Sequence, residues 1–425
     1  MRRIAVVALA AVLASGACST PGASGEVRVL VAGDPEELAA FRAIVDAYRA
    51  AGGGPVRLEE VAERDDLVAR LSTSIAAGDP PDAFLLNYRY YGQFEAAGAL
   101  QPLQSMLDTS DVLDAGSFVP AAMNAFRDDG VQTCIPLNAS SLVLYYNADL
   151  FAAAGLAPPR DDWTWDEMVA AARALTRDVD GDETVDVWGL GVEPQIIRLA
   201  PFVWSSGGSI MDEGAPSRID LGSVRAALAT QAFLDLRGLH EVVPTEEDAE
   251  SIDLETRFLG GGLAMLMESR KVVPTFRTIE DFGWDVAALP RFGRRPVSIL
   301  HSDAFCMTAR AAEPDAAWTF LEFALGPEGQ AIAAQAGRTV PSLRSVAASQ
   351  DFLTPGGSPS NSRVFLAQLD GVRSVPNVAS WPQIEDAVNA LLEEAFYDPS
   401  AGPEAPELIA AIQRATAPLF AQEEA

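Results

Sequence analysis

The chain has 425 residues, of which 49% are hydrophobic and 21% charged, a composition typical of globular protein and long enough for two cores or more. Its formal net charge of −30 repels phosphate backbones and anionic lipid surfaces. We therefore expect no nucleic-acid partner.

The N-terminus has the pattern of an export signal. Arg2 and Arg3 form a basic region, residues 4–14 are apolar, and small residues lead to Cys18. The apolar run is shorter than the about 20 residues that a membrane-spanning helix needs, and no later stretch is apolar for that long. We therefore expect an exported chain whose mature part has no transmembrane helix.

The stretch "LASGAC" resembles the bacterial lipoprotein signal. This resemblance implies a signal peptide over residues 1–17, a lipid on Cys18 that anchors the protein at the outer face of the cytoplasmic membrane, and a flexible tether over residues 18–25. Ordinary cleavage near Ala17 is the alternative.

The first third of the mature chain alternates between strand and helix patterns. Strands alternating with helices predict a mostly parallel sheet covered on both faces, with ligands at the carboxyl ends of the strands. Asp34 follows the first strand, and Asn87, Tyr88 and Arg89 follow the third. The expected strands are residues 26–33, 55–62 and 81–87, and the expected helices are 34–54 and 65–78.

Further elements follow in the remaining sequence. Residues 134–147 form a β-branched and aromatic run that predicts a strand region, within which Asn138 and Ser140 are polar. Thr164 and Glu167 form a capping box at the start of a predicted helix. The expected later helices include residues 161–178, 314–325 and 380–396.

The acidic stretch "DVDGDETVDVWG" resembles a calcium loop in its spacing. Glu183 occupies the glycine position of that loop, and Gly189 stands where the bidentate glutamate belongs. An acidic surface turn and a calcium site therefore both remain open. The candidate ligands are Asp178, Asp180, Asp182 and Asp186.

Taken in order, several stretches resemble the extracellular solute-binding proteins of bacterial ABC importers, in the branch that includes maltose-binding protein. The resemblance covers essentially the whole mature chain. It rests on "PDAFLLN", "IPLNASSLVLYYNADLFAAAGL", "TWDEM", "WSSGGSIM", "FLGGGLAMLMESR", "AAWTFLEFALGPEGQ" and "GRTVPS".

This family resemblance implies an α/β fold of two lobes, each with a mostly parallel sheet and helices on both faces, joined by hinge strands around a ligand cleft. Lobe 1 is expected to contain residues 26–135 plus 304–350. Lobe 2 is expected to contain residues 136–303 plus 351–425. Cys134 and Cys306 would lie on the two hinge strands, so a disulfide between them becomes reasonable, with two buried free cysteines as the alternative.

Sugar recognition needs flat aromatic faces and convergent polar groups. Trp204, just before Gly207 and Gly208, is either a cleft aromatic or a core tryptophan. Trp381 lies in the first turn of a predicted helix, where maltose-binding relatives stack an aromatic on sugar, with simple packing as the alternative. Asp34 is either a hydroxyl-binding acid or a helix cap, or both.

The stretch "AMLMESRKVV" contains Lys271, the sole lysine of the chain, where the resemblance places a stacking tryptophan. Arg270 and Lys271 could pair with an anionic ligand, or Lys271 could face solvent while Glu268 neutralises Arg270. Arg338 is a further cleft candidate. The ligand-binding prediction comprises Asp34, Asn87, Tyr88, Arg89, Asn138, Ser140, Trp204, Gly207, Gly208, Arg270, Lys271, Arg338 and Trp381.

These features predict the monomeric substrate-binding component of an ABC sugar importer, which delivers a mono- or oligosaccharide to a membrane permease and has no catalytic residues. A binding protein for an anionic ligand, such as a glycerol phosphate or acidic sugar, is the first alternative. An anchored glycoside hydrolase is the second, although no GxSxG, P-loop or metal-ligating His/Cys cluster occurs. No cofactor is expected other than calcium at the acidic loop.

Overall fold

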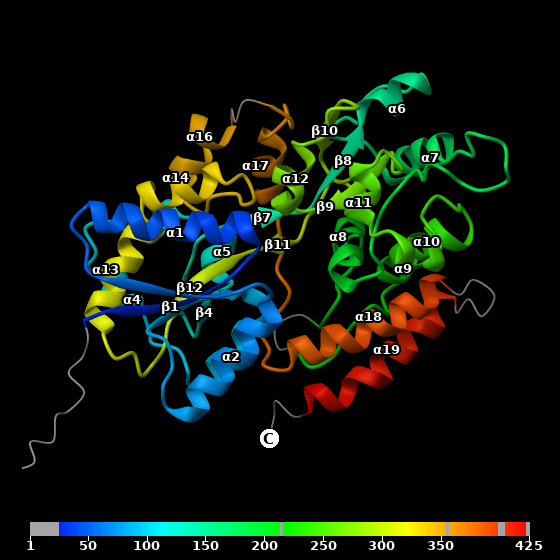
Figure 1. The fold of residues 1–425 in the computed structure, drawn as a ribbon. Helices are drawn as coiled ribbons and strands as arrows, with labels where there is room; N and C mark the ends of the chain where they lie inside the picture. The colour runs from blue at the N-terminus through cyan, green and yellow to red at the C-terminus, as the bar shows by residue number, and fades with distance from the viewer. Residues whose placement is uncertain (1–24, 213–215, 354–356, 398–403, 422–425) are drawn as a thin grey trace, which may run out of the picture.

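The computed structural model describes residues 25–212, 216–353, 357–397 and 404–421. The predicted signal peptide and lipidation site at Cys18 lie outside these residues. Figure 1 shows two halves side by side, one formed by the blue, cyan and yellow segments and the other by the green, orange and red segments. Segments far apart in the sequence therefore build each half.

The first half contains a five-stranded mixed sheet in the order β2-β1-β3-β12-β6. β1 runs parallel to β2 and β3, as the alternation of strands and helices predicts, whereas β12 runs antiparallel to β3 and β6. The strands are β1 (Val27–Ala32), β2 (Val56–Val61), β3 (Ala83–Asn87), β6 (Cys134–Pro136) and β12 (Asp303–Met307).

Helices cover both faces of this sheet because its strand residues alternate between two apolar cores. Val29 and Val31 pack with Phe41 in one core, while Leu30 packs with Leu71 in the other. The helices of this half include α1 (Pro35–Ala50), α2 (Arg64–Ala77), α3 (Tyr91–Ala96), α13 (Pro314–Leu325) and α14 (Pro327–Gln335).

The second half contains a three-stranded sheet in the order β10-β8-β9, in which both pairs of strands are antiparallel. The expectation of a mostly parallel sheet here was wrong. Several helices separate β8 from β9 along the chain, so the alternation of one strand with one helix that predicts a parallel sheet is absent from this half. The strands are β8 (Val143–Asn147), β9 (Met265–Glu268) and β10 (Trp284–Ala287).

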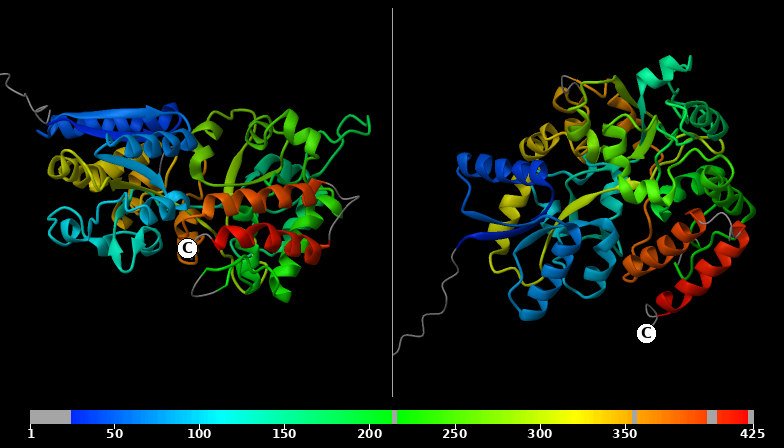
Figure 2. Two further views of the ribbon diagram at one scale, coloured as in Figure 1. Left: turned by 90° about the horizontal axis from the view of Figure 1, so that it is seen from below. Right: turned by 45° about the vertical axis from the view of Figure 1, so that its right-hand side comes forward.

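The helices of this half surround its sheet and pack against one another (Figure 2). The capping box of Thr164 and Glu167 forms as predicted at the start of α7. The helices of this half include α7 (Trp165–Leu175), α8 (Ile196–Ser206), α9 (Val224–Gly238), α11 (Leu254–Leu259), α17 (Arg363–Leu369), α18 (Trp381–Tyr397) and α19 (Ala405–Phe420).

Two antiparallel segments connect the sheets. One runs from β6 through β7 (Ser140–Ser141) into β8, and the other runs from β11 (Leu300–His301) into β12. The residue ranges of the two lobes stay a prediction. Val375 and Asn377, which belong to predicted lobe 2, hydrogen-bond to Tyr88 and Ala125 beside the first sheet.

Shorter elements complete the fold. None of the helices in the described part of the chain is long and apolar enough to cross a membrane. These elements are η1 (Tyr88–Tyr90), α4 (Gln104–Asp108), η2 (Ala115–Ser117), α5 (Pro120–Asn124), β4 (Arg127–Asp128), β5 (Val131–Gln132), α6 (Ala148–Ala153), α10 (Glu246–Ser251), η3 (Arg270–Val272), α12 (Val273–Phe276), α15 (Arg344–Ala347) and α16 (Gln350–Leu353).

Candidate functional site

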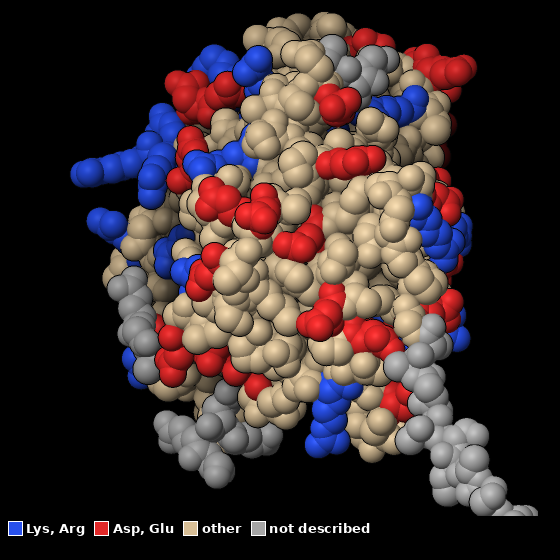
Figure 3. All heavy atoms as spheres, turned by 90° about the vertical axis from the view of Figure 1, so that its left-hand side faces the viewer, with Lys and Arg blue, Asp and Glu red and all other residues tan. Residues whose placement is uncertain are grey.

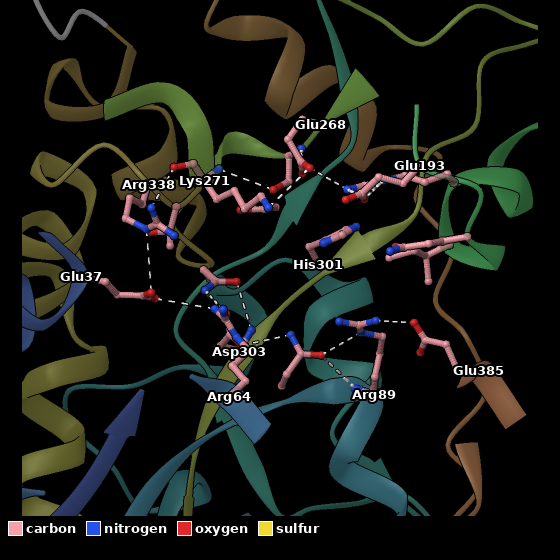
Figure 4. Close-up of a pocket in the computed structure, with 18 of the residues that line it drawn as sticks. Glu37, Arg64, Arg89, Glu193, Glu268, Lys271, His301, Asp303, Arg338 and Glu385 are labelled. Atoms are coloured by element: carbon pink, nitrogen blue, oxygen red, sulfur yellow. Dashed lines mark hydrogen bonds and ion pairs between the residues drawn. The ribbon is translucent and has the colours of Figure 1, made fainter. Parts of the chain in front are cut away.

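A polar cavity of about 330 Å³ lies between the two halves (Figure 4). Charged and amide side chains dominate its walls, and Ile197 is the only aliphatic side chain among the residues that line it. The lining residues are Glu37, Arg64, Asn87, Arg89, Asn138, Ser140, Glu193, Gln195, Ile197, Arg198, Glu268, Ser269, Lys271, His301, Asp303, Arg338, Thr339, Glu385 and Asn389.

The wall from the first half forms where parallel strands end. Glu37 lies in the first turn of α1, which follows β1, and Arg64 is the first residue of α2, which follows β2. Asn87 ends β3 and caps η1, which carries Arg89. The carboxyl ends of these strands therefore supply the polar groups, as the strand-end rule predicts.

Asp303 is the centre of a buried polar network on this wall. Arg64 Nη2 lies 3.2 Å from Asp303 Oδ2, and the amides of Asn87 and Asn138 donate to its two oxygens at 3.0 and 3.1 Å. Burial by itself would raise the pKa of Asp303, but Arg64 and the two amides hold it below its ordinary value. Asp303 is therefore ionised at neutral pH.

Arg338 joins this wall to the opposite one. Its guanidinium forms an ion pair with Asp34 and donates to the backbone oxygen of Lys271 at 3.0 Å. Asp34 also caps α1, since its Oδ1 accepts from the backbone N–H of Glu37 at 3.0 Å. The predicted helix cap at Asp34 is therefore confirmed. Asp34 does not line the cavity itself, but its carboxylate pairs with Arg338, which does.

On the opposite wall, Arg198 and Lys271 share Glu268. Arg198 Nη2 lies 2.6 Å from Glu268 Oε2, and Lys271 Nζ lies 3.6 Å from the same oxygen and 2.6 Å from Glu255 Oε1. Burial would raise the pKa of Glu268 and lower that of Lys271, yet these pairings shift both in the opposite directions. Both groups are therefore charged.

His301 lies on β11 between the two walls (Figure 4). Burial and the nearby Arg198, Arg89 and Lys271 hold the pKa of His301 well below its ordinary value. Its imidazole is therefore neutral at physiological pH and can donate or accept one hydrogen bond at each nitrogen according to its tautomer.

Three buried polar atoms of the lining residues have no hydrogen-bond partner: Glu37 Oε2, Arg198 Nη1 and His301 Nε2. An unpaired buried polar atom costs about 1–3 kcal/mol. A ligand that hydrogen-bonds to these atoms would recover that free energy.

The structure places six predicted site residues around the cavity: Asn87, Arg89, Asn138, Ser140, Lys271 and Arg338. Tyr88 does not line it. Its side chain is 2% exposed, and its hydroxyl accepts from the backbone N–H of Val375. Whether the six residues contact ligand stays a prediction.

The stacking role expected for Trp381 was wrong, because its side chain is 0% exposed. Its indole N–H donates to Glu385 Oε2 at 2.8 Å, and the other oxygen of Glu385 pairs with Arg89. The segment just before α18 packs on the first half: a Cβ added at Gly92 would lie 2.7 Å from the backbone of Val378. Trp381 therefore orients a carboxylate that lines the cavity instead of facing the ligand.

Trp204, Gly207 and Gly208 also lie away from the cavity lining. Trp204 is 5% exposed, with the guanidinium of Arg373 5.0 Å from its ring centre, so the core reading is correct. Gly207 ends α8 in a left-handed conformation with φ of 85°, and Gly208 packs closely on Ala226. These glycines serve helix termination and helix packing, not the approach of a ligand.

Arg270 is buried away from the cavity, with its guanidinium 4.3 and 4.9 Å from the ring centres of Phe352 and Phe365. Burial lowers the pKa of Arg270 to about 10. The ligand role expected for Arg270 was therefore wrong, and so was its neutralisation by Glu268. Cation–π contacts hold this side chain in place of an acid.

Several lining residues were not predicted. Glu37 and Arg64 follow the same strand-end rule that selected Asp34 and Asn87, so that rule could have found them. Arg198 stands within the apolar run "IIRLAPFVW", and a lone cation in such a helix needs a buried partner. The other unpredicted lining residues are Glu193, Gln195, Ile197, Glu268, Ser269, His301, Asp303, Thr339, Glu385 and Asn389.

The structure confirms the disulfide between Cys134 and Cys306, which face each other across β6 and β12. It joins the two segments that connect the sheets at their entry into the first sheet.

The acidic loop keeps both readings open. Carboxylate oxygens of Asp178, Asp180 and Asp186 lie within 4.8 Å of one another, the one such group among the described residues. Asp182 is not part of this group. All four aspartates accept hydrogen bonds from backbone N–H groups of the loop, and Glu183 adopts a positive φ of 72° at the glycine position. Calcium binding here stays a prediction.

Comparison with known proteins identifies the family. Residues 43–355 match the family model of the bacterial extracellular solute-binding proteins. A putative binding protein of Brucella abortus is 24% identical over 382 residues, covering 88% of this chain and 89% of that protein.

Two solved structures share the fold. An ABC substrate-binding protein from Listeria monocytogenes, in complex with cycloalternan, superposes with a TM-score of 0.82 at 24% identity, covering 92% of this chain and 98% of that one. The sugar-binding protein MalE from Xanthomonas citri gives 0.81 at 18% identity, covering 94% and 98%. These matches confirm the two-lobe α/β fold. The chain belongs to the bacterial extracellular solute-binding proteins.

Proposed function

We propose that the protein is the substrate-binding component of an ABC importer and captures a small neutral saccharide in the cavity between its lobes. The cavity of about 330 Å³ is near the lower end of the roughly 300–1,000 Å³ range of small-molecule sites. A mono- or disaccharide suits that volume. Solved relatives that bind sugars, such as the Listeria protein with cycloalternan, support the ligand class.

We propose a neutral ligand because the charges that line the cavity already neutralise one another. Each cation lining the cavity already has an acid within 4.0 Å: Asp303 for Arg64, Glu385 for Arg89, Glu268 for Arg198 and Lys271, and Asp34 for Arg338. An anionic ligand would have to compete with these carboxylates. Hydroxyl groups, which both donate and accept, fit such interleaved donors and acceptors without breaking an ion pair.

The lining residues include no Phe, Tyr or Trp, so ring stacking contributes nothing in this conformation. Affinity would come instead from hydrogen bonds to both walls. A ligand that bridges the walls favours the closed arrangement of the lobes by its differential affinity for that arrangement, and the closed form would then deliver it to the permease. The formal net charge of −30 disfavours a polyanionic partner, although basic side chains also lie on the face that Figure 3 shows.

A thermal-shift screen tests the ligand class. The panel contains D-glucose, D-galactose, D-tagatose, maltose, trehalose and sucrose, with sn-glycerol 3-phosphate and D-glucuronate as anionic members. A ligand at 100 times its Kd adds about 2.7 kcal/mol to the free energy of unfolding, so we expect a raised Tm with at least one neutral sugar.

The other outcomes of these experiments would favour an alternative function or contradict the proposal. Stabilisation by the anionic members alone would favour an anionic-ligand binding protein. Release of monosaccharide from a disaccharide on incubation would favour a glycoside hydrolase. No Tm shift with any neutral sugar would contradict the proposal.

The free Nη1 of Arg198 gives a prediction at a single residue. Arg198→Lys keeps a cation beside Glu268 but removes this donor. Because a hydrogen bond to a charged group is worth about 1.5–3 kcal/mol, sugar affinity should fall about 10- to 100-fold. Calorimetric titration with the best sugar of the panel measures the change. Arg225→Lys, on the exposed side of α9, is the control and should bind as the unchanged protein does.

A further inference from the structure

Glu37 is the least compensated carboxyl in the cavity wall. Glu37 lines the cavity and is 6% exposed. Its Oε2 has no hydrogen-bond partner. Gly33 leaves room for this carboxyl, since a Cβ at that position would lie 2.7 Å from Glu37 Oε2. The carboxyl is therefore sheltered from solvent by its neighbours, and no protein donor reaches Oε2.

The two nearest cations are engaged elsewhere. Arg64 Nη2 lies 3.9 Å from Glu37 Oε1 but 3.2 Å from Asp303. Arg338 Nε lies 3.9 Å from Glu37 Oε2, while the same guanidinium forms its close pair with Asp34. Asp34 and Asp303 add two like charges beside Glu37. Figure 4 shows Glu37 facing Arg338 and the Arg64–Asp303 pair from the α1 side of the cavity.

We propose that Glu37 accepts a hydrogen bond from a hydroxyl of the bound sugar, and that this contact couples ligand binding to the protonation of Glu37. This inference rests on the proposed saccharide function and deepens it, because it assigns a contact and a pH dependence to one side chain.

The electrostatics of the site support this coupling. Burial raises the pKa of Glu37 to about 7 against the opposing effect of Arg64 and Arg338, with Asp303 and Asp34 raising it further. A large fraction of the unliganded protein therefore carries a proton on Glu37 at pH 7. A hydroxyl donor stabilises the carboxylate form and lowers the pKa, so binding expels that proton.

The sign of the pH dependence follows by linkage. Because the pKa of Glu37 is lower in the liganded state, affinity is highest above pH 7 and falls as the pH drops toward 6, by at most tenfold per pH unit. Asp303 and His301 do not change charge in this interval, because the pKa of Asp303 lies below its ordinary value and that of His301 well below its own. Arg64 also keeps its charge, since its pKa is raised above its ordinary value.

Calorimetric titration with the sugar that gives the largest thermal shift tests the inference. Titrations at pH 6, 7 and 8, each in two buffers of different ionisation enthalpy, give the affinity and the number of protons released. For the unchanged protein we expect about half a proton released at pH 7 and weaker binding at pH 6 than at pH 8. Glu37→Gln, which cannot titrate, should release no proton and show a flat profile.

Glu95→Gln is the matched control. Burial also raises the pKa of Glu95, the residue lies on α3, and it does not line the cavity, so the pH profile should persist in this variant. Proton release that persists in Glu37→Gln would overturn the inference. So would pH-independent binding by the unchanged protein, and that measurement does not depend on any variant folding. Absence of sugar binding at all three pH values would instead remove the proposed function, and this contact with it.

Discussion

Replacing Trp381 by alanine is expected to lower the free energy of unfolding by about 3–5 kcal/mol, the range for removing a fully buried tryptophan. The side chain is 0% exposed, and truncation also removes the N–H that bonds to Glu385 at 2.8 Å. Urea denaturation measures the change. Trp381→Phe, which keeps most of the apolar volume, should cost less because it loses mainly the hydrogen bond.

The comparison with Trp318, half-buried on α13, separates core packing from a general effect of removing tryptophan. Trp318→Ala should cost clearly less than Trp381→Ala. A Trp381→Ala protein with unchanged stability and abolished sugar affinity would restore the stacking role and contradict the packing described above.

Removing the disulfide is expected to lower the free energy of unfolding by about 2–5 kcal/mol. Cys134 and Cys306 are separated by 172 residues, so the bridge closes a long loop and restricts the unfolded chain strongly. Both residues are 0% exposed, and alanine replaces each sulfur without adding a buried polar group. Denaturation of Cys134→Ala/Cys306→Ala against the oxidised parent measures the effect.

Reduction of the parent protein provides the control, since it removes the same bond without changing the sequence. It should shift the denaturation midpoint in the same direction as the double variant. Two free thiols at these positions in the unreduced, exported protein, detected by mass analysis, would contradict the bond.

The sequence predicts those site residues that lie at the ends of recognisable parallel strands. The strand-end rule located Asn87 and Arg89 because strand direction in the first sheet was readable from the alternation of strands and helices. The same rule would have found Glu37 and Arg64. The rule could not predict His301 and Asp303. These residues reach the cavity from a connecting segment whose partner strands are far away in the sequence.

The sequence by itself determined the family and the two-lobe fold, whereas it left the pairing of Cys134 with Cys306 open and the structure decided it. The family and the fold depend on the order of motifs. Local patterns of this kind are present in the chain before it folds.

Only the tertiary structure decided which polar and aromatic side chains meet the cavity. Phe352 and Phe365, on helices distant in sequence, lie against the guanidinium of Arg270, and Trp381 is fully buried although it stands in the first turn of α18. Lys271, next to Arg270 in sequence, instead reaches Glu255 and Glu268 at the cavity. The burial of a side chain depends on what the rest of the fold brings against it, and spacing along a single helix or turn does not contain that information.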